Sequence, residues 1–114
     1  MAQIVKKIGD KEVGFKFTML TIRKYCEMRG ITFNEYDKDM SENVFISSNT
    51  LFRAAVDVWS KGERNLTEYE MDDLLEDMTQ QDYADILKCY SDGMVSALSL
   101  VPTKSNNKQA SKKK

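Results

Sequence analysis

The residue types that most often carry catalysis are scarce in this sequence. Its 114 residues include no histidine, so the commonest general acid–base and the commonest metal ligand are missing. Sites that pair a histidine with a catalytic serine or cysteine are therefore excluded. The two cysteines, Cys26 and Cys89, cannot enclose a structural zinc ion without carboxylate ligands. We expect both to be reduced thiols that pack as small, buried or half-buried apolar side chains.

Phosphate-binding loops are also missing. None of the five glycines belongs to a GxxxxGK or GxGxxG pattern, which are the usual nucleotide-binding signatures. Catalysis by carboxylates alone remains formally open, although nothing in the sequence promotes it. We therefore predict no catalytic, cofactor-binding or metal-binding residues, and a protein that is not an enzyme and acts by binding other proteins.

The carboxylates are concentrated in one segment, 63–85, which has nine acidic residues and a single basic residue, Arg64. Apolar residues recur at helical spacing from Met71 to Met78, which predicts a helix with one apolar face. The residues on its opposite face are the candidate partner-binding residues Tyr69, Asp72, Asp73, Glu76 and Asp77. A solvated surface is the usual explanation of a charge run, and the tyrosine within it adds a partner site as the alternative.

Charge is unevenly distributed along the chain. Residues 1–103 hold 12 basic and 18 acidic residues, whereas residues 104–114 hold five lysines and no acid. An acidic domain repels phosphates, so we predict no nucleic-acid partner. Residues 103–114 include one small apolar residue, and we expect a disordered basic tail there because they bury too little apolar surface to fold.

The sequence has no feature of a membrane or secreted protein. No run approaches the roughly 20 apolar residues that span a bilayer. No apolar run follows the lysines near the N-terminus, and two cysteines are few for a secreted chain of this size. We therefore predict a cytoplasmic protein without a membrane partner.

The chain begins with the pattern of a β-hairpin over 3–17. Val13, Phe15 and Phe17 alternate with polar residues or glycine, which is the period of a strand with one buried face. Residues 9–11, Gly-Asp-Lys, supply the turn. A lone hairpin is marginal in water, so this apolar face must pack on helices.

Helical spacing follows directly after the hairpin. Thr18 is predicted to cap a helix that ends at Gly30, since glycine readily adopts the left-handed conformation that closes a helix. A polar connector is predicted from Ile31 to Met40, with one short turn at 33–36. This connector leads into the centre of the chain.

A central, well-buried helix is predicted next. Apolar residues from Phe52 to Trp59 form a wide apolar arc, and Phe45 is expected to extend it upstream. The start of this helix is left open between Ser41 and Ser48, because weak helix formers lie between them. Gly62 is its predicted end.

Two capped helices complete the chain. Thr67 and Glu70 fit a capping box, and residues 79–82 offer a second N-cap. Apolar residues at helical spacing over 83–101 define the last helix, which Pro102 ends.

Together these elements predict an α+β fold that is mostly α, with an N-terminal β-hairpin packed on a bundle of about four helices. One folded domain is predicted over 1–102, with the hairpin at 3–17 and the helical part at 18–101. The predicted core residues are Ile22, Phe52, Val56, Trp59, Leu75, Ile86, Leu87, Tyr90 and Leu98.

This organisation resembles the tail assembly chaperones of long-tailed bacteriophages, which are siphovirus-type and often encoded in prophages. The resemblance covers roughly residues 3–100. It rests on the turn and strand at 8–17, the Gly-terminated helix at 18–30, the apolar helix at 52–62 and the acidic capped helix from Thr67. None of these stretches is a catalytic signature.

The resemblance implies a function and its partners. Proteins of this family bind the long, helical tape measure protein in the host bacterial cytoplasm and keep it soluble until tail tube subunits displace them. They are generally absent from the mature virion, and many are also made in a longer, frameshifted form. The expected client is thus a tape measure protein, with the tail tube protein as a partner of any frameshifted form. The lack of nucleotide motifs predicts holding without ATP.

A different class of function fits the same acidic surface. A small acidic regulator, such as an antitoxin-like or anti-repressor protein, would use it to occlude a basic DNA-binding partner. Gene order separates the two: a downstream gene for a long helical protein supports the chaperone, and a toxin or repressor gene supports the regulator. Self-association and the stoichiometry of the client stay open.

Overall fold

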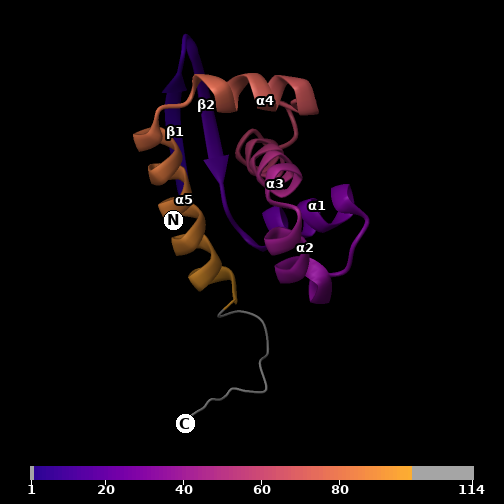
Figure 1. Cartoon of the computed structure of the whole chain (residues 1–114). Helices are drawn as coiled ribbons and strands as arrows, with labels where there is room; N and C mark the ends of the chain where they lie inside the picture. The colour runs from indigo at the N-terminus through magenta and orange to yellow at the C-terminus, as the bar shows by residue number, and fades with distance from the viewer. Residues whose placement is uncertain (1, 99–114) are drawn as a thin grey trace.

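A computed structural model describes residues 2–98, with the side chains of 96–98 excepted (Figure 1). The predicted basic tail at 103–114, the predicted end of the last helix at 101–102 and the predicted domain boundary at 102 lie outside these residues. In chain order the elements are β1 Gln3–Ile8, β2 Lys11–Lys16, α1 Met19–Arg29, the 3-10 turn η1 Phe33–Glu35, α2 Tyr36–Glu42, α3 Val44–Trp59, α4 Glu68–Asp77 and α5 Gln80–Leu98.

A two-stranded antiparallel hairpin packs on five helices, which confirms the predicted mostly helical α+β fold. Figure 1 shows α5 running along β1 while α3 lies beside β2, with α4 near the tip of the hairpin. The helices outnumber the predicted four by one, because the segment predicted as a connector contains α2. Within residues 2–98, each helix is too short or too polar to cross a bilayer.

The hairpin has a two-residue turn. β1 pairs with β2 from Gln3 opposite Lys16 to Ile8 opposite Lys11. Gly9 takes φ 63° in this turn, a left-handed conformation that glycine adopts without steric cost. The turn predicted at 9–11 is thus confirmed at its first two residues.

Helices cover the apolar face formed by Val13, Phe15 and Phe17, all of which are buried. The ring of Phe15 meets that of Phe52 in α3 edge to face, with 5.6 Å between centroids. The ring of Phe17 meets that of Tyr90 in α5 in the same way at 5.5 Å. The predicted packing of the hairpin through its alternating apolar residues is confirmed.

The prediction of a polar connector over 31–40 is wrong in part, because this segment contains most of α2. The short turn predicted there is confirmed by η1. Tyr36, in the first turn of α2, is buried, and its ring packs edge to face on Tyr25 of α1 at 5.2 Å. The other buried residue of α2 is Asp39. A carboxylate on the inward face conceals the apolar spacing by which a helix is recognised.

α3 begins at Val44, between the two starts that the sequence left open, and ends at Trp59, before the predicted Gly62. The prediction that Phe45 extends its buried face is wrong, because Phe45 is 91% exposed in the first turn. The buried residues of this stretch are the polar Ser47, Asn49 and Thr50. The side chains of Ser47 and Asn49 donate hydrogen bonds to backbone carbonyls of other segments. These bonds satisfy two of the three buried polar side chains, so polar residues can form the buried face of this part of α3.

The predicted caps of α1, α4 and α5 are present. Gly30 closes α1 with φ 69°. Thr67 and Glu70 exchange side-chain and backbone hydrogen bonds at the start of α4, which is a complete capping box. Thr79 and Asp82 do the same before α5.

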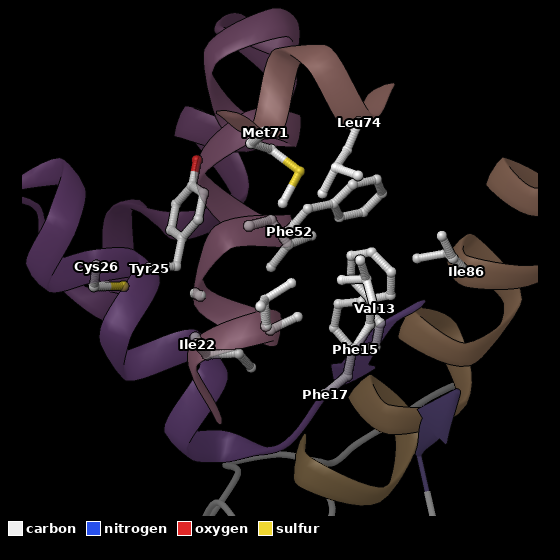
Figure 2. Packing of buried hydrophobic residues seen from close by; sticks show 14 of the residues in the cluster. Val13, Phe15, Phe17, Ile22, Tyr25, Cys26, Phe52, Met71, Leu74 and Ile86 are labelled. Carbon is white, nitrogen blue, oxygen red and sulfur yellow. The ribbon is translucent and has the colours of Figure 1, made fainter. Parts of the chain in front are cut away.

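Four predicted core residues are fully buried: Ile22, Phe52, Val56 and Ile86. Figure 2 shows Phe15, Phe52 and Ile86 converging from β2, α3 and α5. Three others are partly buried against this core: Trp59, Leu75 and Tyr90. The side chain of Leu98 lies outside the described residues.

Leu87 is 37% exposed, so its prediction as a core residue is wrong. The inward face of α5 passes instead through Ile86 and Gly93, where the hairpin comes so close that an added Cβ would lie 2.5 Å from the carbonyl oxygen of Phe17. Successive residues of an α-helix point about 100° apart, which turns Leu87 to the edge of this face.

Replacing Ile86 and Leu87 separately by alanine tests this assignment of the α5 face. Ile86→Ala should lower the free energy of unfolding by about 2–5 kcal/mol, because it leaves a cavity in the core. Leu87→Ala should cost less than about 1 kcal/mol, because its side chain is already partly hydrated. Urea unfolding of both variants measures the difference, and equal losses would contradict the assignment.

Candidate partner-binding surface

All five predicted partner-binding residues lie on the outward face of α4. Tyr69 is 82% exposed, and the four acidic residues with it are exposed as well. Met71 and Leu74, on the opposite face, are buried. The predicted exposure of this face is confirmed, whereas its binding of a partner stays a prediction.

Of the five residues, Asp72 forms a hydrogen bond within the chain and Asp77 lies close to the hairpin turn. The Nδ2 group of Asn49 in α3 donates to Asp72 Oδ1 at 2.7 Å and to the Glu68 carbonyl at 3.0 Å, which fastens α4 to α3. Asp77 lies beside the hairpin turn, where its Oδ2 is 3.3 Å from the position that a Cβ at Gly9 would take. Neither contact can be predicted from the sequence, because Asn49 and Gly9 are both distant from α4 along the chain.

The other three residues, Tyr69, Asp73 and Glu76, form what we call the acidic stripe. Their spacing of four and three residues places them in one line along α4, over about 10 Å. Among residues 2–98, no ion pair includes a carboxylate of α4. The stripe can therefore offer negative charge to basic side chains and an exposed aromatic ring as an apolar anchor.

A second surface is an apolar groove between α1, η1, α2 and α5. It consists of two adjoining cavities of about 380 and 580 Å³ that share Ile22 and Phe33. Apolar side chains at its rim are partly open to solvent, with Leu20 38%, Phe33 42% and Val95 75% exposed. A groove of this size and lining can accept apolar side chains of another protein.

Sequence reasoning missed this groove. Its walls come from segments far apart in the chain, and the hydroxyl groups of Tyr36 and Tyr90 meet in it at 2.8 Å across 54 residues. The sequence does contain apolar residues, such as Leu20 and Val95, that do not belong to the predicted inward faces of the helices. These residues indicate that some apolar surface stays exposed, but they do not show that it gathers in one groove.

A cluster of strongly perturbed titratable groups lies between α1 and α2. Asp39 accepts hydrogen bonds from the Tyr25 hydroxyl, from Arg29 through Nε and Nη2 at 2.9 Å each, and from Asn43 at 3.0 Å. The Arg29 hydrogen bonds hold the pKa of Asp39 well below its ordinary value. Burial, helped by the bond to Asp39, raises the pKa of Tyr25. This cluster joins two helices and does not open into either surface described above.

The cysteine thiols have little nucleophilic character. Cys26 is buried, Cys89 is partly buried, and neither forms a disulfide, as expected. Burial raises the pKa of both thiols, which keeps them protonated near neutral pH. Within residues 2–98, no three cysteine, aspartate or glutamate side chains gather as a metal site.

Comparisons with models of protein families, with curated proteins and with solved structures found no match. The family resemblance therefore rests on the residues quoted for it.

The Asp39 cluster predicts a loss of stability in acid. A carboxyl group whose pKa is lowered by folding stabilises the protein fully above its ordinary pKa of 3.8, and this contribution is lost progressively as the pH falls from that value through the lower pKa of the folded state. Asp39→Asn should lower the unfolding free energy by about 1–3 kcal/mol at pH 6, because it removes charge-assisted hydrogen bonds.

Urea unfolding at pH 6 and pH 3 checks the sign. The stability difference between wild type and Asp39→Asn should shrink at pH 3. The pKa values of Asp82 and Asp85 are also lowered in the folded protein, but they act in both proteins and cancel. A difference that is the same at both pH values would show that Asp39 acts only through packing.

Proposed function

We propose that this chain is a bacteriophage tail assembly chaperone, which binds the tape measure protein and keeps it soluble during tail morphogenesis. The observation that carries the proposal is the acidic stripe. Within it, a tyrosine that is 82% exposed lies beside carboxylates with no ion-pair partner among residues 2–98. A hairpin followed by helices is also the arrangement that the family resemblance implies.

A partner explains the stripe better than solubility alone. Carboxylates that gather without cations repel one another and weaken the compact state. Solubility would be served equally well by charges without an exposed aromatic ring. Tyrosine is enriched where proteins bind one another, because its ring supplies apolar area at a small entropic cost.

A helical client fits the geometry of the two surfaces. The acidic stripe extends along about two turns of α4, so lysines or arginines three and four residues apart on a client helix can face it. The apolar groove offers a separate surface lined in part by Met19 and Met94, whose flexible side chains adapt to different partners. Contacts of this kind suit a protein that binds many similar segments of one long client.

The proposal has consequences for when and where the chain acts. It works in the host cytoplasm, where the client is made, and leaves when tail tube subunits polymerise around the client. A frameshifted longer form would contact those subunits. Because binding competes with aggregation of the client by mass action, holding requires no ATP.

Reversing two charges of the acidic stripe tests the proposal. Asp73→Lys combined with Glu76→Lys should leave the circular dichroism spectrum unchanged, because both side chains are exposed. It should reduce pull-down of the tape measure protein at least about tenfold at low salt, since like charges then face the client. At high salt the wild type should lose part of its own binding, because the Debye length falls to about 3 Å at 1 M.

A matched control carries the same charge change on other helices. Glu27→Lys combined with Glu42→Lys alters exposed carboxylates of α1 and α2 and should retain the client. Unchanged affinity and salt dependence in the stripe variant would show that the stripe is only a solvated surface. Capture of a DNA-binding toxin or repressor in place of the tape measure protein would favour the acidic regulator.

A further inference from the structure

A basic pocket lies where the end of β2, the start of α1 and the loop after α3 meet. It has a volume of about 480 Å³, and its charged lining residues are Lys16, Arg23, Lys24, Lys61 and Asp57. Four of the 12 basic residues of the acidic region 1–103 thus gather in one place. The pocket adjoins the apolar groove, with which it shares Leu20 and Arg23, but neither the groove nor the acidic stripe accounts for its positive charge.

The cations in the pocket are only partly neutralised. Lys24 pairs with Asp57 at 3.7 Å, and Arg23 pairs with Glu27 at 3.6 Å in a largely exposed contact that contributes little. Within residues 2–98, the ion pairs do not include Lys16 or Lys61. The pocket therefore carries a net positive charge within a predominantly acidic domain.

The backbone at Lys61 is strained. Lys61 has φ 56° and is the one residue other than glycine with positive φ in the described part of the chain. Gly62 follows with φ 85°, and its N–H donates to the Asp57 carbonyl at 2.8 Å, so the loop turns tightly at the end of α3. A glycine at position 61 would adopt this conformation without steric cost. A lysine held there places a charge at the pocket at the expense of local stability.

The start of α1 adds to the positive potential. Thr18, its N-cap, and Leu20, in its first turn, both line the pocket, and this first turn has no acidic residue. The N-terminus of a helix carries a partial positive charge and backbone N–H groups without partners in the helix. The N-terminus of α1 therefore adds to the positive potential that the basic side chains create in the pocket.

We infer that this pocket binds a short chain of linked phosphates, either free or carried by a nucleotide. Four cations around one cavity can neutralise several phosphate charges, and lysine binds phosphate as a point charge. A long nucleic acid is disfavoured because the acidic stripe and the rest of the domain would repel its backbone. A compact phosphate chain fits within the pocket and avoids that repulsion. The inference is independent of the proposed chaperone function.

Titration of the full chain with inorganic triphosphate at low salt tests the inference by calorimetry. Lys61→Gly should weaken binding about tenfold, the loss of one charge-assisted contact. The same variant should keep or raise the thermal midpoint, because glycine relieves the strain at this position. Weaker binding with an undiminished midpoint separates loss of the site from loss of the fold.

Two further variants set the direction of the effect. Asp57→Asn removes the carboxylate of the pocket and should tighten triphosphate binding several-fold. Lys88→Gln, an exposed lysine of α5 outside the pocket, should leave the affinity unchanged. Circular dichroism confirms folding of each variant.

The identity of the ligand follows from three titrations of the wild type. Equal affinity for ATP and triphosphate assigns the site to the phosphate chain alone, and tighter ATP binding assigns it to a nucleotide. Duplex DNA should bind more weakly than either. No heat of binding with millimolar triphosphate, equal losses in Lys61→Gly and Lys88→Gln, or tighter binding of DNA would overturn the inference.

Discussion

Phe52 occupies the point on which the rest of the fold depends. Its ring, almost wholly buried in the middle of α3, packs against Phe15 of the hairpin at 5.6 Å and against Tyr83 of α5 at 5.8 Å. Figure 2 shows Met71 and Leu74 of α4 approaching the same ring. A two-stranded hairpin is not stable alone, and a helix with a wide apolar arc must be covered on several sides. One cluster of side chains meets both requirements, so the hairpin, α3, α4 and α5 stabilise one another.

This packing decides which surfaces remain for function. α4 turns Met71 and Leu74 inward to complete the core, and its opposite face is left to solvent with the acidic stripe on it. The apolar groove arises where the core ends, between α1 and the second half of α5. The negative stripe is therefore separate from the apolar groove and the basic pocket, which adjoin each other at Leu20 and Arg23.

Local signals in the sequence predicted much of this fold. The turn at Gly9, the close of α1 at Gly30 and the capping box at Thr67 each depend on residues within a few positions of one another. The errors arose where burial depends on distant partners. α2 was missed because Asp39 is buried only with hydrogen bonds from Tyr25, Arg29 and Asn43, and Phe45 was placed inward although buried polar residues follow it. The helical spacing of apolar residues in α4 correctly predicted that Tyr69 is exposed. No local pattern shows that Asp72 accepts a hydrogen bond from Asn49, or that the apolar groove exists.

The proposed function is that this chain keeps a long helical client soluble by binding it. This function is tested most directly by co-expression with the proposed client, a tape measure protein, followed by sedimentation and by size-exclusion chromatography of the supernatant. The tape measure protein should sediment when it is expressed alone. With this chain it should stay in the supernatant and elute in a complex that survives removal of ATP. A tape measure protein that is equally soluble without this chain, or that elutes apart from it, would contradict the proposed chaperone function.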